Sequence, residues 1–94
     1  MIKIDGNEIY RNYDKVGSVS GNYIYDRDGD KIGYFEENYI YDRDGNKQAY
    51  IEGAYLLSYS GGSLRVSLDK INESIEGGVV SEIGKCAIYV LLGS

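Results

Sequence analysis

Four acidic residues have the spacing of a calcium-binding loop. They occupy its first, third, fifth and twelfth positions as Asp26, Asp28, Asp30 and Glu37. The sixth position, where the loop bends sharply and needs glycine, is Lys31. In the related segment further along the chain, the twelfth position is Gly53, which has no ligand atom. We therefore interpret these carboxylates as charged hairpin tips, and we expect neither a metal nor a cofactor.

The groups that catalysis needs are poorly represented. The chain has no histidine, the commonest general base, and one cysteine, Cys86, whose apolar neighbours indicate a buried hydrophobic residue. Glu36 and Glu37 are consecutive, and consecutive strand residues point to opposite faces, so they cannot form a glycosidase pair. We expect no enzymatic activity.

Tyrosine is the residue type with the clearest functional content, because the chain has 11 tyrosines and no tryptophan. Its stiff, amphipathic ring suits protein interfaces and also stacking against sugar rings. The sequence favours a non-catalytic structural or protein-interaction module that self-associates as a homo-oligomer. The alternative is a small-ligand or glycan-binding domain that uses exposed tyrosines. The candidate interface residues are Tyr23, Tyr25, Tyr39, Tyr41 and Tyr55.

Charge and hydropathy exclude other partners. The net charge is -5, and no stretch gathers the basic residues that bind a row of phosphates, so we expect no nucleic-acid partner. The longest apolar run, residues 87–92, is too short to span a bilayer, so we expect no membrane partner. The first residues lack the apolar region of a secretory signal, and we expect a cytoplasmic protein.

An internal repeat predicts the fold. Residues 22–31 return almost unchanged at residues 38–47, a looser copy surrounds Ile9, and a degenerate copy surrounds Leu56. These four units of about 16 residues cover residues 1–67 of a single domain, 1–94. Alternating apolar and polar residues between turn signals predict an all-β fold, a tandem meander of β-hairpins.

Two kinds of turn fix the expected register. Asp28-Gly29 and Asp44-Gly45 predict two-residue type I′ turns, in which both residues have positive φ. Such a turn places Asp26 opposite Lys31 and Tyr25 opposite Ile32. The first unit has a turn one residue shorter. Units are linked by a second set of two-residue turns: Gly6-Asn7, Gly21-Asn22, Glu37-Asn38 and Gly53-Ala54.

Counting from both kinds of turn places the same residues on each face, because side chains alternate with a period of two. The core face is Ile4, Ile9, Val19, Ile24, Phe35, Ile40, Ile51 and Leu56, with Gly17, Gly33 and Ala49 as small residues that permit close approach or bending. The other face is Tyr10, Tyr23, Tyr25, Tyr34, Tyr39, Tyr41, Tyr50 and Tyr55, with Ile32, Gln48 and Glu52.

Residues 68–94 form a closing segment of different character. Leu68, Ile71 and Ile75 have helical spacing behind Ser67 as N-cap, and Gly77-Gly78 would end this short helix. Residues 79–83 and 85–92 are predicted to be two terminal strands, the second of them buried. We expect part of this segment to cover some of the tyrosines.

The repeated Tyr-Ile-Tyr-Asp-Arg-Asp-Gly of residues 23–29 and 39–45 resembles that of the bacterial four-fold β-flower family. The resemblance covers the four units and implies a radial arrangement of hairpins, like petals. Tyr-Asp repeats of bacterial toxins have a similar motif in far longer arrays, and cell-wall-binding repeats normally contain tryptophan. The β-flower family has no established activity, so the resemblance assigns no catalytic residue.

Overall fold

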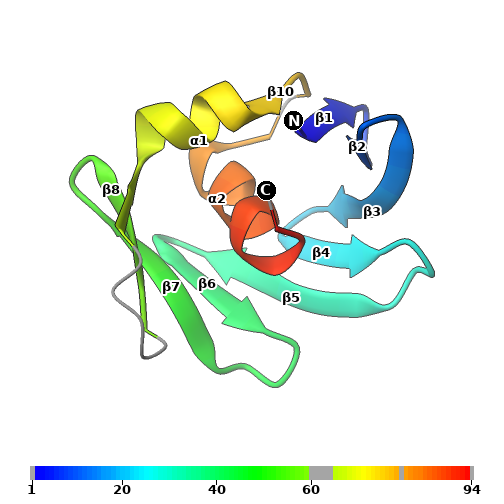
Figure 1. Ribbon diagram of the computed structural model, residues 1–94. Helices are drawn as coiled ribbons and strands as arrows, with labels where there is room; N and C mark the ends of the chain where they lie inside the picture. Colours follow the sequence, from blue (N-terminus) through cyan, green and yellow to red (C-terminus); the bar gives the residue numbers. More distant parts are fainter. Residues whose placement is uncertain (1, 60–64, 79, 94) are drawn as a thin grey trace.

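A computed structural model describes residues 2–59, 65–78 and 80–93 (Figure 1). Within these ranges, 10 strands form one sheet in which β1 to β9 follow chain order and β10 lies beside β1, so the predicted hairpin meander is confirmed. The elements are β1 (Ile2–Asp5), β2 (Glu8–Arg11), β3 (Asp14–Ser20), β4 (Tyr23–Asp26), β5 (Lys31–Glu36), β6 (Tyr39–Asp42), β7 (Lys47–Glu52), β8 (Tyr55–Ser58), β9 (Arg65–Ser67), α1 (Leu68–Ser74), β10 (Ile75–Glu76) and α2 (Glu82–Leu91).

The linking turns join each unit to the next as predicted. Val19 lies opposite Ile24 across the second of these turns, and Phe35 lies opposite Ile40 across the third. The second residue of each turn also accepts a backbone hydrogen bond across the base of the hairpin that it begins. Asn22 O, for example, accepts from Phe35 N at 2.9 Å, and Asn38 O accepts from Ile51 N at 2.9 Å. This repeated bond extends the strand pairing of each hairpin to its first residue.

Glu37 occupies a position that glycine takes in the other linking turns. Its φ is 54°, against 62°, 57° and 61° for Gly6, Gly21 and Gly53. A side chain is strained there, so Glu37→Gly should raise the free energy of unfolding by about 1 kcal/mol. The thermal midpoint should rise by roughly 4 °C. Glu36→Gly, in the adjacent strand, is the control and should lower the midpoint. A Glu37→Gly midpoint at or below that of the wild type would show that this turn carries no strain.

The Asp-Gly tips differ from the predicted two-residue turns. Gly29 and Gly45 have positive φ, 88° and 86°, as expected, but the preceding aspartates do not. Gly29 N donates to Asp26 O, and Asp26 N donates to Asp30 O, which closes a three-residue loop. Asp26 Oδ1 also accepts from the backbone of Asp28 and Asp30 at 2.9 and 3.0 Å. The predicted Asp26–Lys31 pair is therefore wrong, because this carboxylate caps its own turn.

A β-bulge compensates for the longer loop. The register shifts by one residue between Ile24 and Tyr25, so Tyr25 lies opposite Lys31 and not Ile32. Outside the bulge, Ile24 faces Gly33 as predicted. Ile32 packs against the hydrophobic core, which corrects its predicted place among the tyrosines. The same shift occurs in the first and third units.

The closing segment begins with the predicted helix and then departs from prediction. Ser67 caps α1, with its Oγ accepting from Lys70 N at 3.2 Å. Ile75 then starts β10, which pairs in parallel with β1 through Ile2. The predicted terminal strands are wrong: residues 82–91 form the helix α2, capped by Ser81, while Val79 lies outside the described residues. A continuous apolar run does not distinguish a buried strand from a buried helix.

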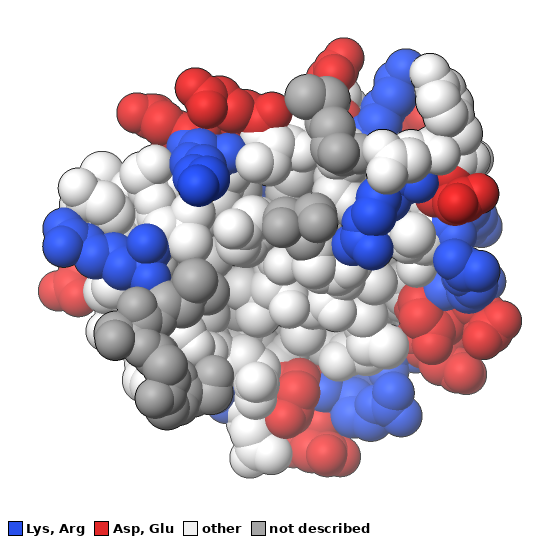
Figure 2. Space-filling model, in the orientation of Figure 1, with Lys and Arg blue, Asp and Glu red and all other residues white. Residues whose placement is uncertain are grey.

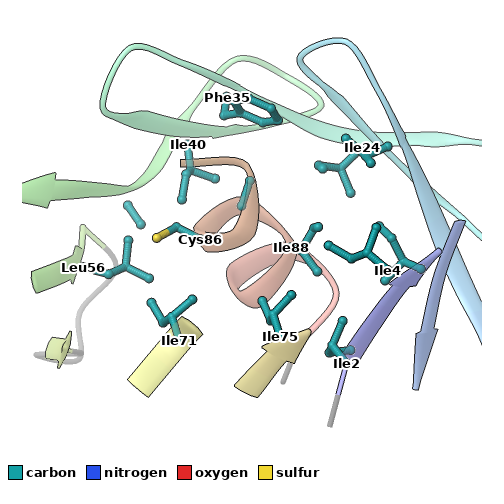
Figure 3. Packing of buried hydrophobic residues seen from close by; sticks show 14 of the residues in the cluster. Ile2, Ile4, Ile24, Phe35, Ile40, Leu56, Ile71, Ile75, Cys86 and Ile88 are labelled. Atoms are coloured by element: carbon teal, nitrogen blue, oxygen red, sulfur yellow. The ribbon is translucent and has the colours of Figure 1, made fainter. Parts of the chain in front are cut away.

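The sheet curls around α2, with its hairpins arranged about the helix (Figure 1). Side chains from the strands, from α1 and from β10 converge on Cys86 and Ile88 in the centre (Figure 3). The predicted core face is confirmed: its large side chains are buried, except Ile51, which is partly buried against the same cluster. Gly17 and Gly33 lie beneath the side chains of Leu92 and Leu91.

Candidate functional site: the tyrosine surface

The outward side of β4 to β8 carries a group of aromatic side chains that neither helix covers. They alternate with the buried residues that face α2, so they point away from both helices. The expectation that the closing segment covers part of them is wrong for its described residues, because α1 and α2 pack on the opposite face. We call this group the tyrosine surface: Tyr23, Tyr25, Tyr34, Tyr39, Tyr41, Tyr50 and Tyr55.

Contacts between rings order much of the tyrosine surface. Tyr34 and Tyr41 stack with centroids 4.7 Å apart and planes 11° from parallel. Tyr39 contacts Tyr41 and Tyr50, each at 6.4 Å, and Tyr23 contacts Tyr34 at 6.0 Å. Three of the five predicted interface residues, Tyr23, Tyr39 and Tyr41, therefore belong to one connected network.

The other two predicted residues lie outside that network. Tyr25 is half-buried on β4, opposite Ser18 on one side and Lys31 on the other. Tyr55 is 37% exposed, and Tyr23 is 43% exposed. Within the tyrosine surface, the most exposed residues are thus the first residues of β4 and β8.

Cations cover one face of three tyrosines. Lys31 Nζ lies 4.5 Å from the Tyr23 centroid, and Lys47 Nζ lies 4.1 Å from that of Tyr39. The guanidinium carbon of Arg65 lies 3.9 Å from the Tyr55 centroid. Each pair joins the first residue of one strand to a cation on the next strand. The sequence analysis missed these pairs because it paired Lys31 with Asp26. The bulge, which was not predicted, shifts Lys31 by one residue and brings it next to the tyrosines.

The first unit has an ion pair at the same place. Glu8 stands where the other units have tyrosine, and its carboxylate lies 2.5 Å from Lys15 Nζ. The hydrogen bond that Lys15 donates to the Glu8 carboxylate raises the pKa of Lys15. The cation is thus retained in all four units, while its partner changes from a carboxylate to an aromatic ring.

The acidic tips stabilise the hairpins themselves. The pKa of Asp42 is lowered, first because its carboxylate accepts the backbone N–H of Asn46. Gln48 donates a further hydrogen bond to Asp42 Oδ2 at 3.1 Å. Within the described ranges, no three histidine, cysteine, aspartate or glutamate side chains gather in a way that could hold a metal ion. These carboxylates therefore have a local structural role.

The arrangement offers contact area and hydrogen-bonding groups. Figure 2 shows a different side of the molecule, the side on which α2 and the C-terminus lie, where charged side chains of both signs surround a largely uncharged middle. Cys86 lies far from any such surface, at 0% exposure, and burial raises its pKa to about 12. Neither helix in the described part of the chain is long and apolar enough to cross a membrane.

Comparison with known proteins supports the same architecture. Residues 22–66 match the family model of the 4-fold beta flower protein. No curated protein and no solved structure matches the chain. The matched residues contain the second and third hairpins, with Tyr23, Tyr39 and Tyr55 and the cations that cover them. Over these residues, the chain resembles the 4-fold beta flower proteins.

Proposed function

We propose that this domain is a cytoplasmic, non-catalytic interaction module that binds further copies of itself through the tyrosine surface. The observation that carries the proposal is the position of both helices on the opposite face, which leaves the aromatic rows uncovered. Large aromatic patches on a protein surface usually mark an interaction site.

The composition of the tyrosine surface supports an interface. Tyrosine and arginine are enriched in protein interfaces, and the surface combines tyrosines with Arg65 and two lysines. The contacts between rings already restrict their motion, so ordering them on binding costs little entropy. The tyrosine surface is therefore preorganised for binding.

A second copy fits this surface because its pattern repeats. The two central hairpins carry the same tyrosines and lysines at the same spacing, for example Tyr23 with Lys31 and Tyr39 with Lys47. A two-fold axis between copies would place the second hairpin of one against the third hairpin of the other. Such an arrangement uses one set of contacts twice, as isologous dimers do.

The alternative, stacking of sugars on these central tyrosines, has less support. A sugar ring needs a free aromatic face. Lys31 and Lys47 already cover one face of Tyr23 and Tyr39, and Tyr41 is stacked on Tyr34. These contacts favour a protein partner at this surface.

The double variant Tyr23→Ser/Tyr55→Ser tests self-association. It removes the two most exposed rings of the tyrosine surface and leaves the Tyr34–Tyr41 stack intact. Light scattering should give a smaller mass than the wild type, while circular dichroism should show an unchanged fold. Tyr13→Ser, a change at a 99% exposed tyrosine outside this surface, is the control and should leave the mass unchanged. A double variant with the wild-type mass would refute the proposed surface.

A further inference from the structure

Tyr13 combines full exposure with an unfavourable backbone conformation. It lies at the tip of the first hairpin, where Asn12 has a φ of 51° and Tyr13 a φ of 75°. The second and third hairpins place Gly29 and Gly45 at their positive-φ positions. The ring of Tyr13 is 99% exposed, so it gains almost nothing from packing. A bulky residue held in this conformation without burial points to a role in binding.

Tyr13 borders a groove on the outward side of the sheet. The groove has a volume of about 420 Å³ and is lined by Lys3, Asp5, Tyr10, Asn12, Tyr13 and Glu76. Strand register explains how it forms: Glu76, Lys3 and Tyr10 are directly opposite one another across β10, β1 and β2. The groove therefore lies where the closing segment joins the first unit, and it requires the folded chain.

The polar side chains of this groove are available to a ligand. Lys3, Asp5 and Glu76 are exposed, and among the described residues none of their side chains forms a hydrogen bond or an ion pair. They offer carboxylate acceptors and an ammonium donor, and the amide of Asn12 provides both kinds of group. Ligand sites commonly combine such polar groups with aromatic walls.

We propose that this groove binds a neutral oligosaccharide. The rings of Tyr10 and Tyr13 provide apolar surfaces for the C–H faces of sugar rings. Hydroxyl groups of a sugar both donate and accept, so they match carboxylates, an amide and an ammonium together. An anionic ligand would be repelled by Asp5 and Glu76, and a cationic ligand would have to compete with Lys3 for these two carboxylates. This function differs from self-association and uses a different part of the outward face.

The variant Tyr13→Gly separates binding from stability. Removing the side chain relieves the backbone strain, so the thermal midpoint should rise. The probes are cellotetraose, maltotetraose and N-acetylated chitotetraose, with tetralysine as a cationic probe, titrated at millimolar concentration and followed by tyrosine fluorescence. At least one tetrasaccharide should bind the wild type, and Tyr13→Gly should weaken that binding about tenfold or more. Tyr23→Ser, the control on the tyrosine surface, should bind it as the wild type does.

Three results would overturn the proposal. One is a wild-type protein that binds none of the three tetrasaccharides, whether or not it binds tetralysine. Another is a Tyr13→Gly variant that retains wild-type affinity. The last is a Tyr13→Gly variant with a lower melting midpoint, which would show that the ring has a structural role.

Discussion

Replacing Gly33 with valine should lower the free energy of unfolding by about 3 kcal/mol or more. A Cβ atom at this position would lie 2.4 Å from the backbone oxygen of Tyr41 and 2.6 Å from Leu91 Cδ1. The Tyr41 oxygen belongs to the backbone and cannot move without disturbing the pairing of β5 with β6, and the Leu91 side chain, at the end of α2, would have to change its rotamer. The clash therefore affects the sheet and the packing of Leu91 on it.

Denaturant titration of Gly33→Val would measure this loss, and the thermal midpoint should fall by roughly 12 °C or more. Gly21→Ala is the matched control: its φ is +57°, but nothing lies within 4 Å of the added atom. Backbone strain alone should lower the free energy of unfolding of Gly21→Ala by about 1 kcal/mol. Equal stability of Gly33→Val and the wild type would show that the backbone of β6 does not lie this close to Gly33.

Cys86 should react with thiol reagents only when the domain unfolds. Its side chain is fully buried in the middle of α2, and burial raises its pKa from 9.0 to about 12. The reactive thiolate is therefore roughly a thousandfold scarcer at pH 8 than in the unfolded chain, even before access is considered. Native protein should resist an aromatic disulfide reagent, and protein in guanidinium should react at once. Modification of native Cys86 at the rate of the unfolded chain would exclude its central position.

The same burial makes stability depend on pH. The pKa of Cys86 is higher in the folded state than in the unfolded state, so its contribution is complete below pH 9.0. As the pH rises from 9.0 toward about 12, the thiol ionises in the unfolded chain before it does so in the folded chain. The free energy of unfolding therefore falls by up to about 4 kcal/mol over this range. Cys86→Ala lacks this ionisation, so the stability difference between wild type and variant should shrink over this range.

The hairpin register could be predicted because it depends on local rules. Counting from a linking turn places Ile24 opposite Val19, and counting from the Asp-Gly turn places it opposite Gly33, as the structure shows. The Asp-Gly tips were predicted less well. Gly29 has the expected positive φ, but Asp26 caps a loop of three residues and not two. The β-bulge between Ile24 and Tyr25 compensates for the extra residue, so the pairs beyond the bulge are the same as for a two-residue turn.

The central helix could not be predicted because its environment is created by distant residues. Residues 85–92 are almost entirely apolar, and such a run is stable as a strand or as a helix once it is buried. The curled sheet leaves a central space, and α2 fills it with Cys86, Ala87 and Ile88. The groove beside Tyr13 was missed for a related reason, since Glu76 reaches Lys3 only through the pairing of β10 with β1.

Sedimentation equilibrium of the wild-type protein over a wide range of concentrations tests the central claim most directly. One chain has a mass of 10.5 kDa. Because neither helix covers the tyrosine surface and its rings are already ordered, the apparent mass should rise with concentration to at least that of two chains. A mass that stays at 10.5 kDa at the highest concentration would contradict self-association through this surface.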